Sequence, residues 1–367
     1  MRIGIDARLT HYRQAGISRY TIQLVEALAR LDPTDHFVLL QSFRATEPLV
    51  THPAFERRSL YTPAHHALEQ LTLPLEIRKF GLDVLHSPDF LPPFRRNCRS
   101  VITIHDLAFL LYPHFLTKES ARYYGQIDEA VRRTDAIIAV SEATKNDIVR
   151  LLGVPESRIT VVYEAASSVF KPLDRAQAAT YVRERLGVRG DYVLFISTIE
   201  PRKNVPTLLK AFHKLLKDYR LDLQLVLAGD KGWLVDEVQQ LVTDLGLTDQ
   251  VLIPGRVSTD DLVQLYNAAQ VLVAPSIYEG FGLTPLEAMA CGTPVVVSNV
   301  SALPEIVGDA GLLVDPYDIE ELAVAMWRVV TDSELRQNLI AKGLKRASFF
   351  SWDRAAKETL ELYHRLA

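Results

Sequence analysis

The chain has little cysteine, little net charge and no long hydrophobic run, and each absence excludes a class of protein. Cys98 and Cys291 are the only cysteines and lie outside any C-x-x-C spacing, so neither a disulfide framework nor a structural zinc site is expected. A net charge of −4 offers no basic surface for nucleic acid, which is therefore not expected as a partner. No apolar run approaches the ~18 residues of a membrane-spanning helix, and the N-terminus has no apolar signal segment. We therefore expect a cytoplasmic protein whose membrane contact, if any, is peripheral at the inner face.

Length and composition predict two globular domains. The chain has 367 residues, of which 48% are hydrophobic and 23% charged, as in ordinary folded proteins. A domain usually takes about 100–200 residues, so each half is long enough to bury its own core.

Apolar strand-like runs alternate with amphipathic helical patterns along the whole chain. The helical patterns include residues 17–31, 205–219 and 234–245. This alternation predicts an α/β fold with parallel sheets covered on both faces, arranged as two doubly wound, Rossmann-like domains that face each other across a cleft. The predicted strands are 3–7, 37–40, 84–85, 101–104, 136–140 and 159–162 in the first half, and 192–196, 223–228, 251–253, 271–274, 295–297 and 311–314 in the second.

Residues 271–297, VLVAPSIYEGFGLTPLEAMACGTPVVV, combine a strand, a glycine-hinged loop, a helix and a second strand. Gly280 and Gly282 let the backbone pass close to a ligand. We predict that Thr284 caps the helix, with Pro285 at its first position and Glu287 completing a capping box. A helix start of this kind presents free amide groups and a positive dipole end, which favours binding of phosphate oxygens.

Glu279 and Glu287 lie eight residues apart around this helix start. Ionised carboxylates accept hydrogen bonds from hydroxyl groups, so the pair suggests recognition of a sugar or ribose beside the phosphate. The alternatives are structural. The capping box alone would explain Glu287, and Glu279 could be a solvated loop residue.

Further candidates follow predicted strands. Arg202 and Lys203, in EPRKN, come after strand 192–196 and suit contact with a diphosphate, although an R-K pair on its own is more often solvated. His105 closes strand 101–104, where it could contact a sugar hydroxyl or be a satisfied buried histidine. His86 is a weaker candidate of the same kind. Gly16 lies in the first strand-to-helix loop, where a glycine is often only a turn residue.

The string EGFGLTPLEAMACGTPVVVS resembles the donor-site signature of retaining nucleotide-sugar glycosyltransferases of family 4, in particular bacterial mannosyltransferases, which have the two-domain GT-B fold. The resemblance implies that Glu279 touches the donor sugar and Glu287 holds the ribose hydroxyls. It also implies that backbone groups contact the sugar and the phosphate, namely those of Gly280, Phe281, Gly282, Leu283 and Thr284.

The EPRKN string is similar to the family's second donor motif, where Lys203 and Arg202 would neutralise the diphosphate. Many members carry an arginine six residues before that lysine, and this chain has Ser197 there. The resemblance further implies that His105 contacts the transferred sugar from the other domain, that Gly16 faces the diphosphate and that Val257 lies at the nucleotide base.

The resemblance implies domains of residues 1–170 with 351–367, on the acceptor side, and 171–350, which binds the donor. Its last helix, starting near Ser351, would return to the first domain on a face formed by Leu360, Tyr363 and Leu366; the alternative keeps that helix on the second domain. Segment 109–113 and nearby arginines such as Arg96 could touch a membrane, but we expect the segment to be core and the arginines to be solvated.

The expected activity is retaining transfer of a hexose, first of all mannose from GDP-mannose, to a glycan or lipid-linked acceptor. Retention in this family is ascribed to same-face attack assisted by the leaving phosphate. The chain has no D-x-D motif, so no metal and no cofactor besides the nucleotide-sugar substrate are expected. Another donor such as UDP-glucose, a GT-B epimerase or phosphorylase, and a non-catalytic nucleotide-sugar binder are the alternatives.

Overall fold

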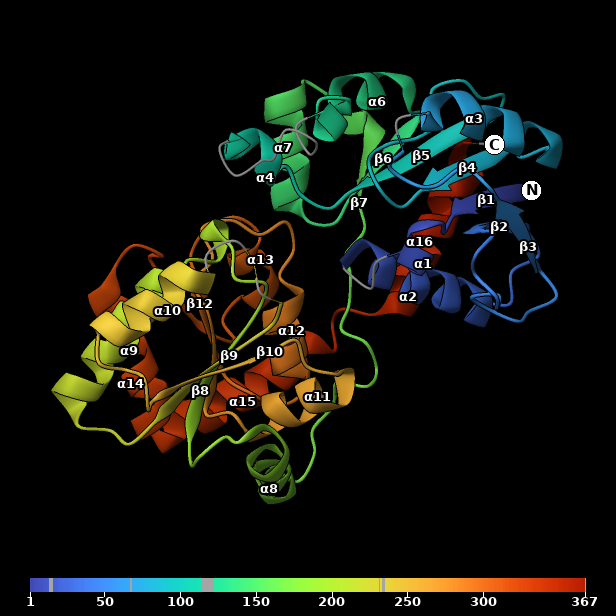
Figure 1. Cartoon of the computed structure of the whole chain (residues 1–367). Helices are drawn as coiled ribbons and strands as arrows, with labels where there is room; N and C mark the ends of the chain where they lie inside the picture. Colours follow the sequence, from blue (N-terminus) through green and yellow to red (C-terminus); the bar gives the residue numbers. More distant parts are fainter. Residues whose placement is uncertain (13–15, 67, 114–121, 231, 233–234, 367) are drawn as a thin grey trace. The chain divides into compact units, whose positions relative to one another are not determined.

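The computed structural model of the chain describes residues 1–12, 16–66, 68–113, 122–230, 232 and 235–366 (Figure 1). It divides into two compact units, Met1–Glu164 with Ser351–Ala367 and Ala165–Phe350, which we call unit 1 and unit 2. The first segment of unit 1 thus ends at Glu164 and not at residue 170. That the units face each other across a cleft stays a prediction.

Unit 1 contains a parallel seven-stranded sheet of order β3-β2-β1-β4-β5-β6-β7. Its strands are β1 (Arg2–Asp6), β2 (His36–Ser42), β3 (Phe55–Leu60), β4 (Val84–Ser87), β5 (Arg99–Ile104), β6 (Ala136–Ala139) and β7 (Ile159–Val161). The sequence prediction missed β3, FERRSL. It is an edge strand whose central side chains are charged and partly exposed, so it carries no apolar run to detect.

The helices of unit 1 include one from the far end of the chain. α16 packs against α2, where the Tyr20 and Trp352 rings meet at 5.7 Å. The predicted apolar face of α16 was partly wrong, because Leu360 and Leu366 are only half-buried. Its buried residues are Trp352, Ala355, Ala356, Thr359, Leu362 and Tyr363. The α-helices of the unit are α1 (Leu9–Tyr12), α2 (Gly16–Arg30), α3 (Glu69–Ile77), α4 (Ala108–Leu111), α6 (Ile127–Arg133), α7 (Glu142–Leu152) and α16 (Trp352–Leu366), with 3-10 turns η1 (Arg78–Phe80) and η3 (Glu156–Arg158).

Unit 2 has the same architecture, with a parallel six-stranded sheet of order β10-β9-β8-β11-β12-β13. Its strands are β8 (Tyr192–Ile196), β9 (Gln224–Ala228), β10 (Val251–Gly255), β11 (Val271–Ala274), β12 (Val295–Ser298) and β13 (Leu312–Val314). The helices are α8 (Arg175–Leu186), α9 (Val205–Tyr219), α10 (Val235–Asp244), α11 (Thr259–Ala268), α12 (Leu283–Ala290), α13 (Leu303–Val307), α14 (Ile319–Thr331) and α15 (Ser333–Ala347), with η4 (Pro201–Lys203).

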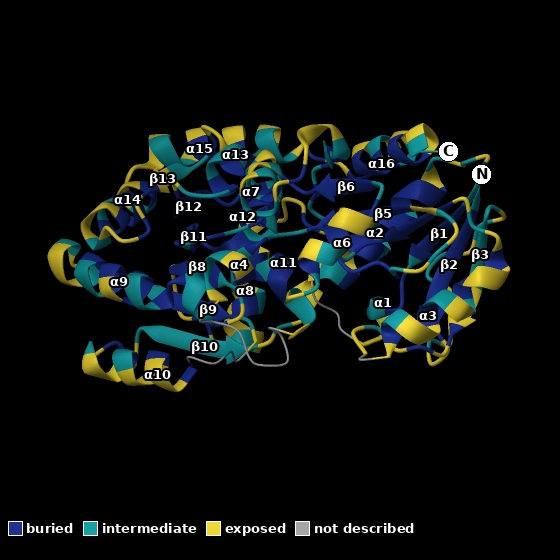
Figure 2. Cartoon of the chain, turned by 90° about the horizontal axis from the view of Figure 1, so that it is seen from above, coloured by how far each residue is buried: buried dark blue, intermediate teal, exposed yellow. Residues whose placement is uncertain are grey.

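Apolar side chains of the strands and covering helices form the cores. In unit 2, Val193 and Phe195 of β8 pack with Leu208 and Phe212 of α9 in one buried cluster. Figure 2 shows the central strands of both sheets in the colour of buried residues. Among the helices that the structure describes, none combines the length and apolar character needed to cross a bilayer.

Both sheets have a point where the strand order reverses. In unit 1 it lies between β1 and β4, and in unit 2 between β8 and β11. Ligands of open α/β sheets bind beyond the carboxyl ends of the strands at such points. A ligand-binding site is therefore expected at the loops that follow these four strands.

Candidate active site

The loops after β8 and β11 bring the basic pair Arg202 and Lys203 close to the acidic residue Glu279. β11 pairs in parallel with β8, so the loop containing Glu279 lies beside η4, which carries Arg202 and Lys203. The amide of Ile277 donates to the carbonyl of Arg202 at 2.8 Å, and the side-chain amide of Asn204 donates to the carbonyl of Pro275 at 3.1 Å. These bonds fix the two loops against each other.

The carboxylate of Glu279 is the centre of this cluster. Its Oε1 accepts from Lys203 Nζ at 2.6 Å and from the Ser276 hydroxyl at 2.7 Å, while Oε2 accepts from Arg202 Nη1 at 3.1 Å. The Glu279 amide donates to the hydroxyl of Ser301 at 2.9 Å. Arg202 also pairs with Glu200 at 2.6 Å. Glu279, Arg202 and Lys203, which the sequence placed after two different strands, therefore lie in one small cluster.

The cluster is largely shielded from solvent, and this sets its protonation. Burial opposes ionisation of Glu279, but Lys203 and Arg202 outweigh it and lower the pKa of this carboxyl to about 2. Burial also opposes the charged form of Lys203, which lowers the pKa of this lysine, and Glu279 only partly offsets that effect. The carboxylate is thus ionised at neutral pH and can accept hydrogen bonds from hydroxyl groups. Its two cationic partners are placed so that a diphosphate could take its position.

The helix after Glu279 begins earlier than the sequence suggested. α12 starts at Leu283, and its N-cap is Gly282, with no side-chain cap. The predicted Thr284 cap and its capping box with Glu287 are wrong. Gly282 has a φ of 116°, which favours glycine, and a Cβ there would lie 3.1 Å from Leu303 Cδ2. The glycine turn, and not a side chain, therefore ends the loop.

This glycine turn leaves backbone donors at the helix start. Within the described part of the chain, no acceptor takes the amide protons of Leu283 or Thr284, and Pro285 has no amide proton to offer. Phe281 points into the unit, where its ring meets that of Phe350 at 5.8 Å. The helix start of α12, beside Lys203 and Arg202, can therefore bind an anion such as a phosphate.

Glu287 is buried within α12. Its Oε2 accepts from the hydroxyl of Tyr266 on α11 at 2.8 Å, so the carboxylate is not explained as a helix cap. Val257, the residue predicted near a nucleotide base, lies half-buried just before Ser258, the N-cap of α11. Contact of either residue with a nucleotide stays a prediction.

Two glycines after β9 support the site through close backbone packing. A Cβ on Gly229 would lie 1.9 Å from the carbonyl oxygen of Ser197, and one on Gly232 would lie 1.9 Å from that of Ile199. The loop after β9 therefore packs directly on the backbone that leads from β8 to Arg202. Ser276 and Ser301 were missed, since a serine in a loop has no distinguishing sequence signal.

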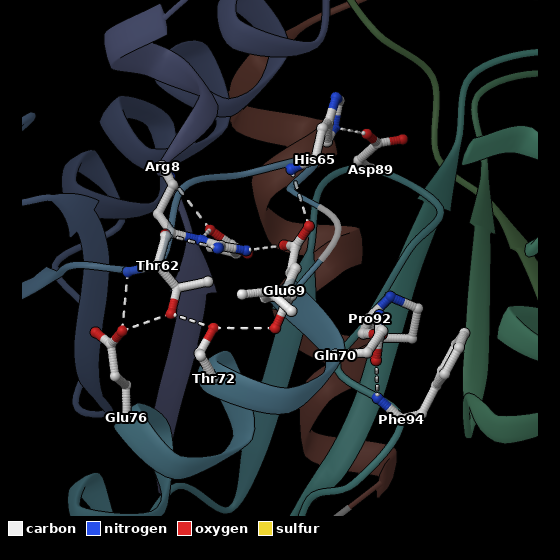
Figure 3. Close-up of polar contacts among 12 residues, drawn as sticks. Arg8, Thr62, His65, Glu69, Gln70, Thr72, Glu76, Asp89, Pro92 and Phe94 are labelled. Carbon is white, nitrogen blue, oxygen red and sulfur yellow. Dashed lines mark hydrogen bonds and ion pairs between the residues drawn. The ribbon is translucent and has the colours of Figure 1, made fainter. Parts of the chain in front are cut away.

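In unit 1, the structure places a cavity of about 350 Å³ at the carboxyl ends of β4 and β5. Its lining includes His105, Asp89 and His65 and the rings of Phe90, Tyr123 and Tyr124. Asp89 accepts from His65 Nε2 at 2.8 Å and from the Tyr123 hydroxyl at 2.7 Å (Figure 3 shows the His65–Asp89 bond). A cavity of this size, with aromatic walls and a few polar groups, is typical of a small-ligand site.

His105 stands at this cavity with both ring nitrogens engaged. Nδ1 lies 3.0 Å from Glu164 Oε1, and Nε2 lies 2.9 Å from the carbonyl oxygen of Pro88. Because both partners are acceptors, the geometry favours the imidazolium form. Burial opposes this charge, but the Glu164 carboxylate outweighs it and raises the pKa of His105. Glu164 follows β7 and was missed, although its position at a strand end is the signal that identified His105.

We predict that Glu164→Gln lowers the pKa of His105 and destabilises unit 1 most at acidic pH. A raised folded-state pKa means that the ion pair contributes its full stability below pH 6.5, the ordinary histidine value, and loses it as pH rises through the folded pKa. The loss at low pH should be about 1.5–3 kcal/mol, as for a hydrogen bond to a charged group. Histidine ring NMR titration and urea unfolding at two pH values measure both effects. An unchanged His105 pKa in the variant would refute the pairing.

His86, the weaker candidate, is a structural residue. It is fully buried, with Nδ1 2.6 Å from the Tyr363 hydroxyl and Nε2 2.8 Å from the Thr103 hydroxyl. Burial lowers the pKa of His86 to about 3, so it is neutral. Through Tyr363 it ties α16 to the sheet. Gly16 is exposed at the start of α2, and a Cβ there would meet nothing within 4 Å, so packing does not require glycine.

The expectations for segment 109–113 are only partly met. Phe109 is buried, and its ring stacks on Tyr124 at 4.3 Å, but Leu110 is exposed. Arg96 is not solvated as expected, because its buried guanidinium bonds the carbonyls of Pro93 and Arg133. Among the described residues, no cluster of three or more histidine, cysteine or acidic side chains could hold a metal. Metal-independent chemistry stays a prediction.

Comparison with known proteins identifies the class. Residues 183–346 match the family described as Glycosyl transferases group 1, and residues 15–166 match Glycosyltransferase Family 4. The chain is 34% identical over 379 aligned positions to O-antigen chain mannosyltransferase B of Escherichia coli, which covers 99% of both chains. It is 30% identical over 274 positions to the serotype-specific mannosyltransferase WbdA of Escherichia coli, covering 73% of this chain and 34% of WbdA.

Solved structures agree on the fold. Sucrose-phosphate synthase from Thermosynechococcus elongatus superimposes with a TM-score of 0.80 at 24% identity, covering 100% of this chain and 99% of the other. Anabaena HepE, solved with UDP and glucose, gives a TM-score of 0.77 at 20% identity, with all of both chains covered. The protein is thus a glycosyltransferase of GT-B fold. The chain belongs to glycosyltransferase family 4.

Proposed function

We propose that this chain transfers a hexose from a nucleotide sugar to a glycan or lipid-linked hydroxyl with retention of configuration, and that mannose from GDP-mannose is the donor. The observation that carries the proposal is the Glu279 carboxylate held by Lys203 and Arg202 beside the open amides of α12. The similarity to O-antigen chain mannosyltransferase B over nearly the full length of both chains supports mannose.

The cluster suggests how the donor binds. A diphosphate would take over Lys203, Arg202 and the amides of Leu283 and Thr284, all of which suit phosphate oxygens. Glu279, released from its cations, would accept hydrogen bonds from hydroxyl groups of the sugar, and Glu287 would accept them from the ribose. Lys203 and Arg202 would then stabilise the charge that develops on the departing diphosphate. Retention would follow from attack on the same face of the sugar, assisted by the leaving phosphate.

The cavity of unit 1 suits the acceptor. Its aromatic rings offer flat apolar faces to a sugar ring, and the Asp89 carboxylate is an acceptor for hydroxyl groups. Hydrogen bonds from His65 and Tyr123 outweigh the burial of Asp89 and lower its pKa, so it is ionised at neutral pH. Contact of His105 with the transferred sugar and of Gly16 with the diphosphate stay predictions.

A screen of nucleotide sugars tests the proposal. The purified protein is incubated with GDP-mannose, UDP-glucose and dTDP-glucose, and thermal shift and nucleotide release are read with and without methyl α-mannoside as acceptor. We expect the largest shift and acceptor-dependent GDP release with GDP-mannose, and an α-linked product by NMR. Preference for a UDP-sugar would show that the donor is a UDP-sugar and not GDP-mannose.

Two other results would show that the protein does not catalyse glycosyl transfer. An epimerised or phosphorolysed nucleotide sugar formed without acceptor would indicate an epimerase or phosphorylase. Binding of a nucleotide sugar with no release under any condition would indicate a binding protein that turns nothing over.

A further inference from the structure

Helix α3 of unit 1 carries an exposed stripe of leucines. Leu68, Leu71 and Leu75 are 52%, 63% and 72% exposed, and their spacing places them along one side of the helix. Figure 2 shows the exposed colour along α3. Three large aliphatic side chains in a row on a surface are uncommon, and a contiguous patch of this kind marks an interaction site.

The opposite side of α3 is fixed to the unit, so the stripe cannot turn inward. Leu73 and Ile77 are buried in the core cluster with Phe80. Polar bonds add to this anchoring (Figure 3). Glu69 pairs with the buried Arg8, and Gln70 donates to the Pro92 carbonyl and accepts from the Phe94 amide. Exposure of the leucines is therefore built into the packing of the helix.

The apolar surface continues beyond α3. Glu76 accepts from the amide of Tyr61 at 2.8 Å, which holds Tyr61 against the last turn of the helix. Tyr61 is 73% exposed, and its ring stacks on the exposed ring of Phe43 at 5.1 Å. The guanidinium of Arg44 lies 5.5 Å from the centre of that ring. We call Leu68, Leu71, Leu75, Tyr61 and Phe43 the leucine surface.

Cations border the leucine surface. Arg78 and Lys79 follow α3 directly in η1 and are exposed, and Arg44 lies beside Phe43. In the described part of the chain, none of these three pairs with an acidic side chain. Glu76, the acid nearest to them on α3, is occupied by the amides of Tyr61 and Thr62. The surface is therefore apolar at its centre and positive at its edge.

We propose that the leucine surface binds the face of an anionic lipid bilayer. Leucines would enter the boundary between headgroups and acyl chains, tyrosine suits the headgroup level, and the three cations would contact lipid phosphates. Charge complementarity selects this partner, because a purely hydrophobic contact would not need cations at its edge. The inference rests on unit 1 alone and does not depend on the donor.

Membrane binding would also place the cavity of unit 1 near the lipid. His65, which lines that cavity, stands three residues before Leu68 and shares its anchoring, since its amide donates to Glu69 at 2.8 Å. The helix that carries the leucine surface thus follows directly from a wall of the cavity. If the acceptor is lipid-linked, as the proposed function holds, it would reach the cavity directly from the bilayer.

Vesicle flotation tests the inference. The full chain is mixed with vesicles of phosphatidylcholine, or of phosphatidylcholine with phosphatidylglycerol, at low and high salt. We expect binding to the anionic vesicles that weakens with salt. Leu71→Gln with Leu75→Gln should lower the partition coefficient by roughly tenfold or more. Arg78→Gln with Lys79→Gln should lower it about fivefold per charge. Tyr317→Gln and Lys210→Gln, exposed in unit 2, are the matched controls and should bind like wild type.

Two results would overturn the inference. The first is a failure of the flotation test: wild-type protein does not float with anionic vesicles, or the variants float as well as wild type does. The other is a variant that changes the association state in solution while vesicle binding is unchanged, which would assign the surface to protein contact. Nucleotide release with methyl α-mannoside should be equal in all variants, which shows that the donor site is intact. Loss of that activity alone would bear on the proposed function and not on the membrane surface.

Discussion

Replacing Lys203 by methionine is expected to lower kcat/KM by about 10²–10³ with the fold intact, since one preorganised electrostatic contact to a developing charge contributes about that factor. Lys203 Nζ lies 2.6 Å from Glu279 Oε1 and is one of the two cations that would face the departing diphosphate. Glu279→Gln should cost a similar factor. Steady-state kinetics with the preferred donor measure both losses.

Stability must be measured alongside turnover, because Lys203 and Glu279 are ion-paired in the structure. Removing the lysine leaves a buried carboxylate with Arg202 as its remaining cation, so the pKa of Glu279 should rise from about 2. Lys214→Met is the matched control. This lysine pairs with Asp218 and Glu320 on the surface of unit 2, and its loss should change turnover little. Wild-type turnover in Lys203→Met would remove the lysine from the mechanism.

Arg8→Met is expected to destabilise unit 1 by about 3–5 kcal/mol, the usual cost of removing one partner from a buried ionic cluster. Arg8 is 1% exposed, and its guanidinium bonds both oxygens of Asp6, the carbonyl of Thr62 and the carboxylate of Glu69. Without it, the buried carboxylate of Glu69 and the half-buried carboxylate of Asp6 remain close together with no cation between them. Urea unfolding followed by circular dichroism measures the loss.

The pH dependence of this loss gives an independent check. Burial already raises the pKa of Glu69 even though Arg8 opposes it, and removal of Arg8 should raise it further. The variant should therefore be least destabilised at acidic pH, where Glu69 can be neutral, and most destabilised at alkaline pH. Arg132→Met, which removes an exposed pair with Glu129, should cost little at any pH. An Arg8→Met protein as stable as wild type would show that the cluster contributes nothing.

The fold was largely predictable because most strands are short apolar runs between amphipathic helices. The bounds of α9, for example, were predicted as residues 205–219 and found there. β3 was missed because its exposed edge carries Glu56, Arg57 and Arg58 in place of apolar residues. The start of α12 was misjudged because Thr284 and Glu287 match a capping box, whereas the positive φ of Gly282 decides where the helix begins.

The site was predictable only as far as single motifs reach. Glu279, Arg202 and Lys203 could be placed at strand ends from sequence, but that they touch depends on the pairing of β8 with β11, a long-range contact. The cavity of unit 1 was not anticipated, since His65, Asp89 and Tyr123 come from three separate segments with no shared motif. Local signals identify residues, while the arrangement of strands decides which of them meet.

A crystal structure of the protein with GDP bound is the most direct test of the central claim, that a nucleoside diphosphate binds at the start of α12. We predict diphosphate oxygens within hydrogen-bonding distance of Lys203 Nζ and of the Leu283 and Thr284 amides, with the ribose hydroxyls at Glu287. A diphosphate bound elsewhere, with the Lys203–Glu279 pair still closed at 2.6 Å, would contradict the account.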